Sequence, residues 1–267
     1  MKINKLTIQA GHNKEGRKEG YSKIEILEGQ KIGIVGPTGS GKSQLLYDIE
    51  KLAYGETKTK RKILINDKKS DKGIKVDATK KIIGFLTQHM NFMTDVTVYN
   101  FLKKHIETRN QNFTKLEIDK LINKVINDAN IITGEKINES SNLLILSGGQ
   151  SRALMIADLA HISESPIILI DEIENAGIKI ENALNLLIKE GKIIFLATHD
   201  PILALGVDER LIMKNGGIKK IVQTSKEEKN IEKELLEINN HFLEIREQIR
   251  EGHQIEELKI ECRLKQK

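Results

Sequence analysis

Short runs of alternating or continuous apolar residues open the chain and predict β-strands. Residues 2–9, 22–27 and 31–35 have this pattern, and a turn at Glu28-Gly29 separates the last two. Apolar positions then recur at helical spacing from Gly41 to about Ala53, which predicts a helix directly after the third strand. A glycine-rich segment therefore lies between a buried strand and the N-terminus of a helix.

A helical pattern fills the middle of the chain. It runs from Val96 to about Ile132, and Thr114 and Glu117 within it have the spacing of a capping box, which marks a helix start. We expect residues from about 94 to 148 to form a separate helical subdomain.

Strand and helix alternate again after this subdomain. The apolar runs 167–170 and 193–197 predict short strands that are buried on both faces of a parallel sheet. A helix from about Ile178 to Glu190 joins them. The predicted fold class is α/β with a mostly parallel core sheet.

The last forty or so residues differ from the rest and predict a C-terminal helical extension over 225–267, after a main domain over 1–224. Ser225 and Glu228 form another capping box. Apolar residues then step alternately by four and three, which is the spacing of a heptad seam. A helix folded back on its own domain and a coiled coil with a partner both fit this pattern. The seam residues are Ile231, Leu235, Ile238, Phe242, Ile245 and Ile249.

Composition and hydropathy indicate a chain that stays out of the bilayer. The 267 residues are 39% hydrophobic, enough for a full core, and the longest apolar runs are far shorter than the roughly 18 residues of a membrane-spanning helix. The N-terminus lacks the apolar segment of a secretory signal, so we expect a cytoplasmic location. One cysteine, Cys262, argues against an internal disulfide and a cysteine-built metal site.

The charge pattern makes nucleic acid an unlikely partner. The 43 basic residues are nearly matched by 38 acidic ones, and the two kinds are interspersed. The densest basic stretch, Lys58–Lys62, precedes a strand-like segment and is expected to be a solvated loop.

The glycine-rich segment matches the phosphate-binding pattern G-x-x-x-x-G-K-[ST]. In this pattern, backbone N–H groups and the positive end of the helix dipole hold phosphate oxygens. Lys42 is expected to reach the β and γ phosphates, and the hydroxyl of Ser43 to bind Mg²⁺. The segment consists of Gly36, Pro37, Thr38, Gly39, Ser40, Gly41, Lys42 and Ser43.

Two acids follow the apolar run at 167–170. Asp171 is expected near Mg²⁺, and Glu172 can polarise a water molecule. A pair of carboxylates at a strand end can also be a solvated turn, but the phosphate-binding segment in the same chain favours the functional interpretation.

A second glycine-rich segment, Leu146-Ser147-Gly148-Gly149-Gln150, also opens a helix. Together with Gln88 and with His199 in Ala197-Thr198-His199-Asp200-Pro201, the ordered motifs resemble those of the ATP-binding cassette (ABC) ATPases. The resemblance covers roughly residues 1–222. It implies a P-loop NTPase fold with an antiparallel β subdomain beside the core sheet and the helical subdomain.

The resemblance also implies ATP and Mg²⁺ as ligands and roles for individual residues. Glu172 would activate the attacking water, His199 would contact the γ-phosphate, and Lys42 would complete the catalytic set. Gln88 would join Ser43 and Asp171 at the metal. Two cassettes would pair head to tail, in a homodimer or with a second cassette, so that one copy covers the nucleotide of the other with Ser147, Gly149 and Gln150.

Two departures from the family pattern stand out. The segment after the acids lacks the usual aspartate at the dimer interface, because Ile178 stands in its place. The aromatic residue that stacks on adenine is also not obvious: we favour His12 over Tyr21 for this position.

Three biological roles share these motifs. The favoured interpretation is a soluble ATPase that remodels or reactivates another protein, such as a cofactor-dependent enzyme. The unusual interface segment fits this role. The ATP-binding subunit of a membrane transporter with a separate permease is the alternative, favoured by the segment 93–98. A nucleic-acid machine is least supported, because the chain has neither a long coiled-coil insertion nor a second cassette.

Overall fold

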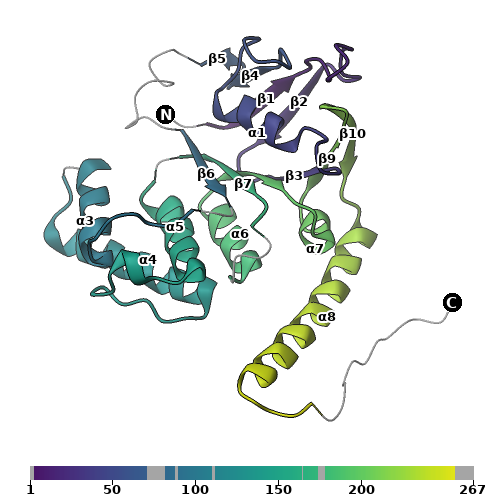
Figure 1. The fold of residues 1–267 in the computed structure, drawn as a ribbon. Helices are drawn as coiled ribbons and strands as arrows, with labels where there is room; N and C mark the ends of the chain where they lie inside the picture. The colour runs from purple at the N-terminus through teal and green to yellow at the C-terminus, as the bar shows by residue number, and fades with distance from the viewer. Residues whose placement is uncertain are drawn as a thin grey trace.

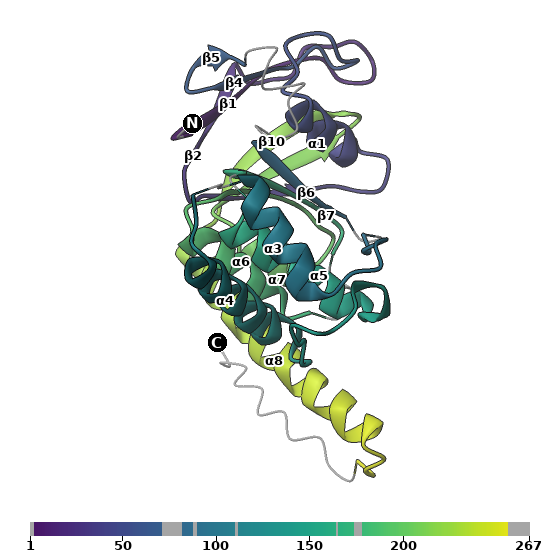
Figure 2. The same ribbon diagram turned by 90° about the vertical axis from the view of Figure 1, so that its left-hand side faces the viewer.

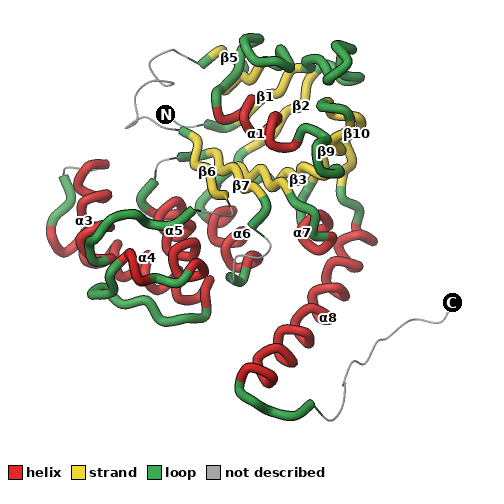
Figure 3. Tube along the Cα trace, viewed as in Figure 1, coloured by secondary structure: helices red, strands yellow, loops and turns green. Residues whose placement is uncertain are grey.

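The computed structural model describes residues 3–70, 82–87, 90–109, 112–163, 165–173 and 178–255 (Figure 1). Figure 3 shows the helices and strands along the same trace. The strands are β1 (Lys5–Gln9), β2 (Lys23–Leu27), β3 (Lys31–Val35), β4 (Lys62–Ile65), β5 (Lys68–Lys69), β6 (Ile83–Thr87), β7 (Ile167–Asp171), β8 (Ile193–Ala197), β9 (Glu209–Lys214) and β10 (Gly217–Gln223). The helices are α1 (Lys42–Glu50), α3 (Val98–Arg109), α4 (Lys115–Thr133), α5 (Gly148–His161), α6 (Ile180–Lys189), α7 (Pro201–Leu205) and α8 (Lys226–Arg250), with the short 3-10 turn η2 (Leu143–Ile145).

The described strands form two sheets. The core sheet has the order β10-β9-β3-β8-β7-β6, and all its neighbours pair in parallel except β10 with β9. The smaller sheet, β2-β1-β4-β5, is antiparallel. Because parallel strands point the same way, β3, β6, β7 and β8 all present their carboxyl ends at one edge of the core sheet.

The core sheet is buried on both faces, as the continuous apolar run of β7 predicts. Ile167 and Leu169 pack into a cluster shared with α1 and the antiparallel sheet. Ile168 and Ile170 point to the opposite face and pack with helices α5 and α6. Figure 2 shows these helices below the sheet and α1 above it.

The helical subdomain is built from α3, α4 and α5 around an apolar core. The capping box predicted at the start of α4 is present: the backbone N–H of Glu117 donates to the hydroxyl of Thr114, and that of Thr114 donates to the Glu117 carboxylate. These elements confirm the predicted fold class, with its antiparallel and helical subdomains.

The structure differs from the sequence interpretation in three places. The first helix ends at Glu50 rather than near Ala53, because Leu52 has a left-handed backbone with φ 46°. The hairpin of β9 and β10 was not predicted. The prediction of a solvated loop at 58–62 is wrong for Arg61. Its side chain is fully buried, and two carboxylates neutralise its charge there.

Helix α8 begins as predicted, with both bonds of the Ser225 and Glu228 capping box present. In both ribbon views it runs away from the core sheet (Figures 1 and 2). Residues 256–267 of the predicted C-terminal extension lie outside the described residues. Within the described ranges, none of the helices combines the length and apolarity that crossing a membrane requires.

Candidate active site

The first glycine-rich segment connects β3 to α1. Gly41 has φ 106°, a conformation that favours glycine, and a Cβ there would lie 2.8 Å from Cα of Gly216 in the β9–β10 turn. The N-terminus of α1 has no capping side chain. Because the first N–H groups of a helix have no partner within it, this terminus is an anion site ready for a phosphate.

Lys42 reaches back over this segment. Its side chain is only 6% exposed, and its Nζ donates to the carbonyl oxygen of Gly36 at 3.0 Å. The same Nζ lies 2.7 Å from Nε2 of His199 and 3.8 Å from Oε1 of Glu172. The structure thus brings together the three residues that sequence reasoning grouped as catalytic.

Glu172 follows β7 with a left-handed backbone at φ 50°. Such a conformation costs a non-glycine residue about 1–3 kcal/mol. The N–H of Glu172 donates to the carbonyl of Ala197 at 3.1 Å, which ties it to the end of β8. The half-exposed carboxylate lies 3.3 Å from Nε2 of His199, so this strained turn aims it at the phosphate segment.

His199 is held by its neighbours on both sides. The N–H of Thr198 donates to the carbonyl of Ile34 in β3. Asp200 caps α7 by accepting from the N–H groups of Ile202 and Leu203. The imidazole therefore projects from a short, anchored link between β8 and α7.

The oxygen donors near Lys42 suit a hard divalent cation. Ser43 is exposed in the first turn of α1, and Asp171 ends strand β7, which β8 separates from β3 in the core sheet. Ser40 adds a buried hydroxyl that has no hydrogen-bond partner in the structure. Hydroxyl and carboxylate oxygens are ligands that Mg²⁺ prefers, so these residues fit a Mg²⁺–nucleotide pair.

Two predicted features lie outside the described residues. Gln88 follows Thr87, the last residue of β6, in the sequence, and it lies outside the described residues. The altered interface segment is described only at Ile173 and Ile178, on either side of 174–177.

The second glycine-rich segment belongs to the helical subdomain, where it starts α5. Ser147 and Gln150 cap each other: the N–H of Gln150 donates to the Ser147 hydroxyl at 3.1 Å, and that of Ser147 to Oε1 of Gln150 at 2.9 Å. The Ser147 hydroxyl also donates to Oε2 of Glu135 at 2.9 Å. Ser147 is exposed, and Gly149 lies half-buried beside it.

His12 lies in the loop after β1, close to the phosphate segment. Its N–H donates to the carbonyl of Thr59 at 2.7 Å, and Nδ1 of its ring is buried with no hydrogen-bond partner. The next-but-one residue, Lys14, donates from Nζ to the carbonyl of Gly39 at 2.7 Å. Tyr21, the alternative stacking residue, uses its hydroxyl to donate to Glu19. His12 therefore stays the candidate for adenine.

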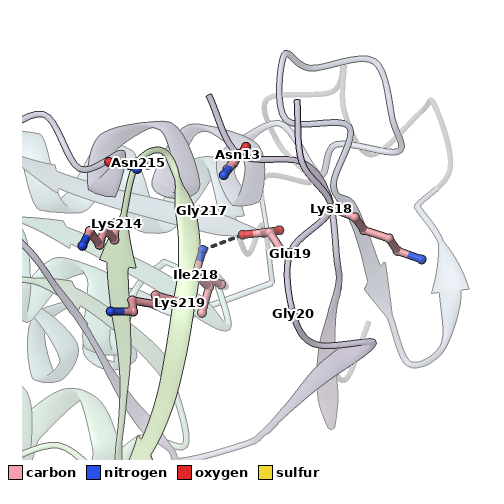
Figure 4. Close-up of a pocket in the computed structure, with 9 residues that line it drawn as sticks. All are labelled: Asn13, Lys18, Glu19, Gly20, Lys214, Asn215, Gly217, Ile218 and Lys219. Carbon is pink, nitrogen blue, oxygen red and sulfur yellow. Dashed lines mark hydrogen bonds between the residues drawn. The ribbon is translucent and has the colours of Figure 1, made fainter. Parts of the chain in front are cut away.

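A pocket beside this loop is lined by residues of the β9–β10 turn and by Glu19 (Figure 4). The Glu19 carboxylate does not face a free space, because it accepts from the N–H of Ile218 at 2.6 Å. In Figure 4 the amine of Lys18 points away from Glu19. The acid of this pocket is thus part of the fold and not a second ligand site.

Glu19 belongs to a buried ionic cluster that sequence reasoning missed. Arg61 donates to both oxygens of Glu19, at 3.0 and 2.6 Å, and to Oδ2 of Asp48 at 2.9 Å. Arg61 also donates to the carbonyl of Gly216. The N–H of Gly216 in turn donates to the carbonyl of Ser40 in the phosphate segment. Burial raises the pKa of Glu19, but the hydrogen bonds and charge of Arg61 outweigh it, and the pKa lies below its usual value.

This cluster helps to hold the phosphate segment in place. Asp48 lies on α1, which follows the segment, and Gly216 contacts the segment directly. A basic residue at the start of a strand gave no sign of burial in the sequence. Its partners come from 42 and 13 positions away along the chain.

A glycine cradle at a helix start, a buried lysine and a strand-end acid define an α/β nucleotide-binding domain of the P-loop class. A family model described as ABC transporter matches residues 22–175. The chain belongs to this family and is an ABC ATPase, which binds and hydrolyses ATP.

One relative is similar over almost its whole length. It is an uncharacterized ABC transporter ATP-binding protein of Methanocaldococcus jannaschii, MJ0121, which is 48% identical over 96% of both chains. Further curated relatives are named as transporters or as parts of import or export systems, and this chain spans between 20% and 62% of their lengths.

Two solved structures share the fold. The dimeric ATP-binding cassette MJ0796 bound to ADP and phosphate has a TM-score of 0.60 at 23% identity, covering 82% of this chain and 99% of that one. The protein cbiO1 from Clostridium perfringens, part of an ABC transporter complex, has a TM-score of 0.62 at 21% identity, covering 93% and 100%.

Proposed function

We propose that this chain is the ATP-binding subunit of an ABC membrane transporter and acts with a separate permease. The observation that carries the proposal is the 48% identity to MJ0121 over almost the whole of both chains, since that relative is named as a transporter ATP-binding protein. Remodelling of a soluble client, the favoured interpretation from sequence, finds no support among the relatives. The proposed location is therefore the membrane surface, through the permease.

We further propose roles for the residues around Lys42. The Lys42 amine and the free N–H groups of α1 bind the phosphates, and Ser43 and Asp171, with Gln88, hold Mg²⁺. When bound, the metal neutralises charge that develops on the phosphates. Glu172 orients and deprotonates the attacking water, and His199 contacts the γ-phosphate. The contacts of His199 with both Lys42 and Glu172 support this assignment.

The site is proposed to be completed by a second copy. In a head-to-tail dimer, Ser147, Gly149 and Gln150 of one chain cover the nucleotide held by the other. The exposure of Ser147 at a helix N-terminus supports this assignment, because the serine is accessible to a partner. The dimeric state described for MJ0796 is consistent with it.

One purification tests the proposed role. The variant Glu172→Gln, loaded with ATP, is expected to accumulate in the closed dimer and to hold its partner during affinity purification from detergent-solubilised cells. A polytopic membrane protein should co-purify and should be absent with Lys42→Ala. Recovery of a soluble enzyme in its place would contradict the transporter role and restore the remodelling one.

A further inference from the structure

A line of apolar side chains along α8 is open to solvent. Ile231 is 47% exposed, Phe242 55% and Ile249 60%, although all three are large and hydrophobic. With the half-buried residues between them they form the α8 seam, defined as Ile231, Leu235, Ile238, Phe242, Ile245 and Ile249. An apolar stripe of this spacing is the type that pairs with another helix.

The base of α8 is fixed to the domain. Glu228 accepts from Arg210 of β9 at 2.5 Å, and Nζ of Lys229 lies 3.8 Å from Asp208. The helix also packs on α7, and its outer half extends away from the core sheet in both views (Figures 1 and 2). Ile231 remains 47% exposed even near this anchored base, so the domain leaves the α8 seam open to solvent there.

We propose that the α8 seam docks against the same seam of a second copy of this chain, with the two helices antiparallel. In this arrangement every seam residue has a partner, and the contact is the same in both directions, as a two-fold axis requires. The pairs are Ile231 with the partner's Ile249, Leu235 with the partner's Ile245, and Ile238 with the partner's Phe242.

The charges beside the seam favour the antiparallel orientation. Glu232 and Arg246 each follow a seam residue, so antiparallel pairing sets Glu232 beside the partner's Arg246, and this contact occurs twice in the dimer. Parallel pairing would instead set Glu227 beside the partner's Glu232, which are like charges.

The surroundings of Glu232 add a second reason. It is half-buried near Glu181, and the pKa of Glu181 is raised, first by burial and then by the charge of Glu232, while the charge of Lys31 opposes the rise. In the antiparallel pair, the partner's Arg246 would lie beside Glu232. The antiparallel pair thus brings a cation to an acidic spot at the helix base.

Sedimentation without nucleotide tests the pairing apart from any ATP-driven dimer, so its failure leaves the proposed transport function untouched. The wild-type chain is expected to dimerise weakly, with a Kd of roughly micromolar order because the contact is small. Phe242→Asp should raise the Kd at least tenfold. Leu243→Asp is the matched control, since Leu243 is 45% exposed but lies outside the seam, and it should leave the Kd unchanged.

Charge reversal tests the orientation. Glu232→Lys and Arg246→Glu should each weaken the dimer severalfold, and the double variant should restore it. Parallel pairing predicts the opposite for Glu232→Lys, because that change would relieve the repulsion by Glu227. A chain that stays monomeric at every concentration without nucleotide, or equal effects of Phe242→Asp and Leu243→Asp, would overturn the proposal. Circular dichroism checks that each variant is folded.

Discussion

Helices α1 and α5 both begin at glycine-rich segments, but their N-termini are in different states. The terminus of α1 has no side-chain cap, whereas that of α5 has a complete capping box of Ser147 and Gln150. Beside α1 lies the buried cation of Lys42, while beside α5 lies the carboxylate of Glu135. The two motifs look alike in the sequence, but the helix start at α1 is uncapped and the one at α5 is capped within its own chain.

The residues that pack against the bodies of α1 and α5 also differ in charge. Asp48 of α1 is held in the buried ionic cluster with Arg61, while the inner face of α5 packs through apolar residues such as Leu154 and Ile156. The α1 site is therefore preformed and electrostatically supported. The α5 terminus is satisfied within its own chain, so in the proposed dimer the partner's nucleotide would meet a capped helix end.

The largest effect is expected from Lys42→Ala. Loss of the buried ammonium group should weaken ATP binding about 100-fold, or roughly 2.7 kcal/mol, because charge-assisted bonds to phosphate are lost. Isothermal titration with a non-hydrolysable analogue measures it. Lys51→Ala, at the opposite end of α1, is the control and should bind normally. Normal binding by Lys42→Ala would remove the distinction between the two helix starts.

Ser147→Asp separates capping from contact with a partner's nucleotide. Aspartate caps a helix as well as serine does, so the cap is kept, but repulsion by Glu135 should lower the melting temperature modestly. Its charge should weaken the ATP-driven dimer about tenfold or more through repulsion, while ATP binding to a single chain stays normal. Ser225→Asp makes the same change in the capping box of α8 and should leave the dimer unaffected. An intact dimer with Ser147→Asp would place this segment away from the phosphates.

The pH dependence of stability tests the ionic cluster that packs against α1. The pKa of Glu19 is lowered in the folded chain, so its contribution to stability is present at neutral pH and is lost as pH falls below the ordinary value of 4.5. Glu19→Gln should cost about 2 kcal/mol at pH 7 and less in acid. Urea unfolding of both chains at pH 7 and in acid measures how the difference in unfolding free energy changes with pH. An equal cost at both would mean that the carboxylate is not held ionised.

The smallest effect is expected from Glu135→Gln. The amide can still accept from Ser147, but the negative charge near the helix N-terminus is gone, so the ATP-driven dimer should strengthen about threefold. Equilibrium sedimentation with ATP in the Glu172→Gln background measures it. Glu139→Gln, a nearby exposed acid, should have no effect. A weaker dimer would indicate that Glu135 supports the contact.

The sequence predicted the elements whose signals are local. The capping box at Thr114 and the apolar run of β7 need only neighbouring residues, and both are present. The glycine-rich segment and Glu172 were likewise identified by motif, and their roles at the site stay predictions. What the sequence could not predict depends on distant partners: Arg61 is buried because Glu19 and Asp48 approach it, and Ser147 meets Glu135 through the packing of the helical subdomain.

The close approach of Gly41 to Gly216 restricts which sequences can adopt this site. A methyl group at Gly41 would meet the backbone of Gly216, and one at Gly216 would lie 2.5 Å from Cγ of Lys14. Both glycines also have positive φ angles, so neither can be replaced without strain. A hairpin far along the chain thus limits the phosphate segment: a side chain at Gly41 cannot be accommodated by a smaller residue at 216, because glycine already has no side chain.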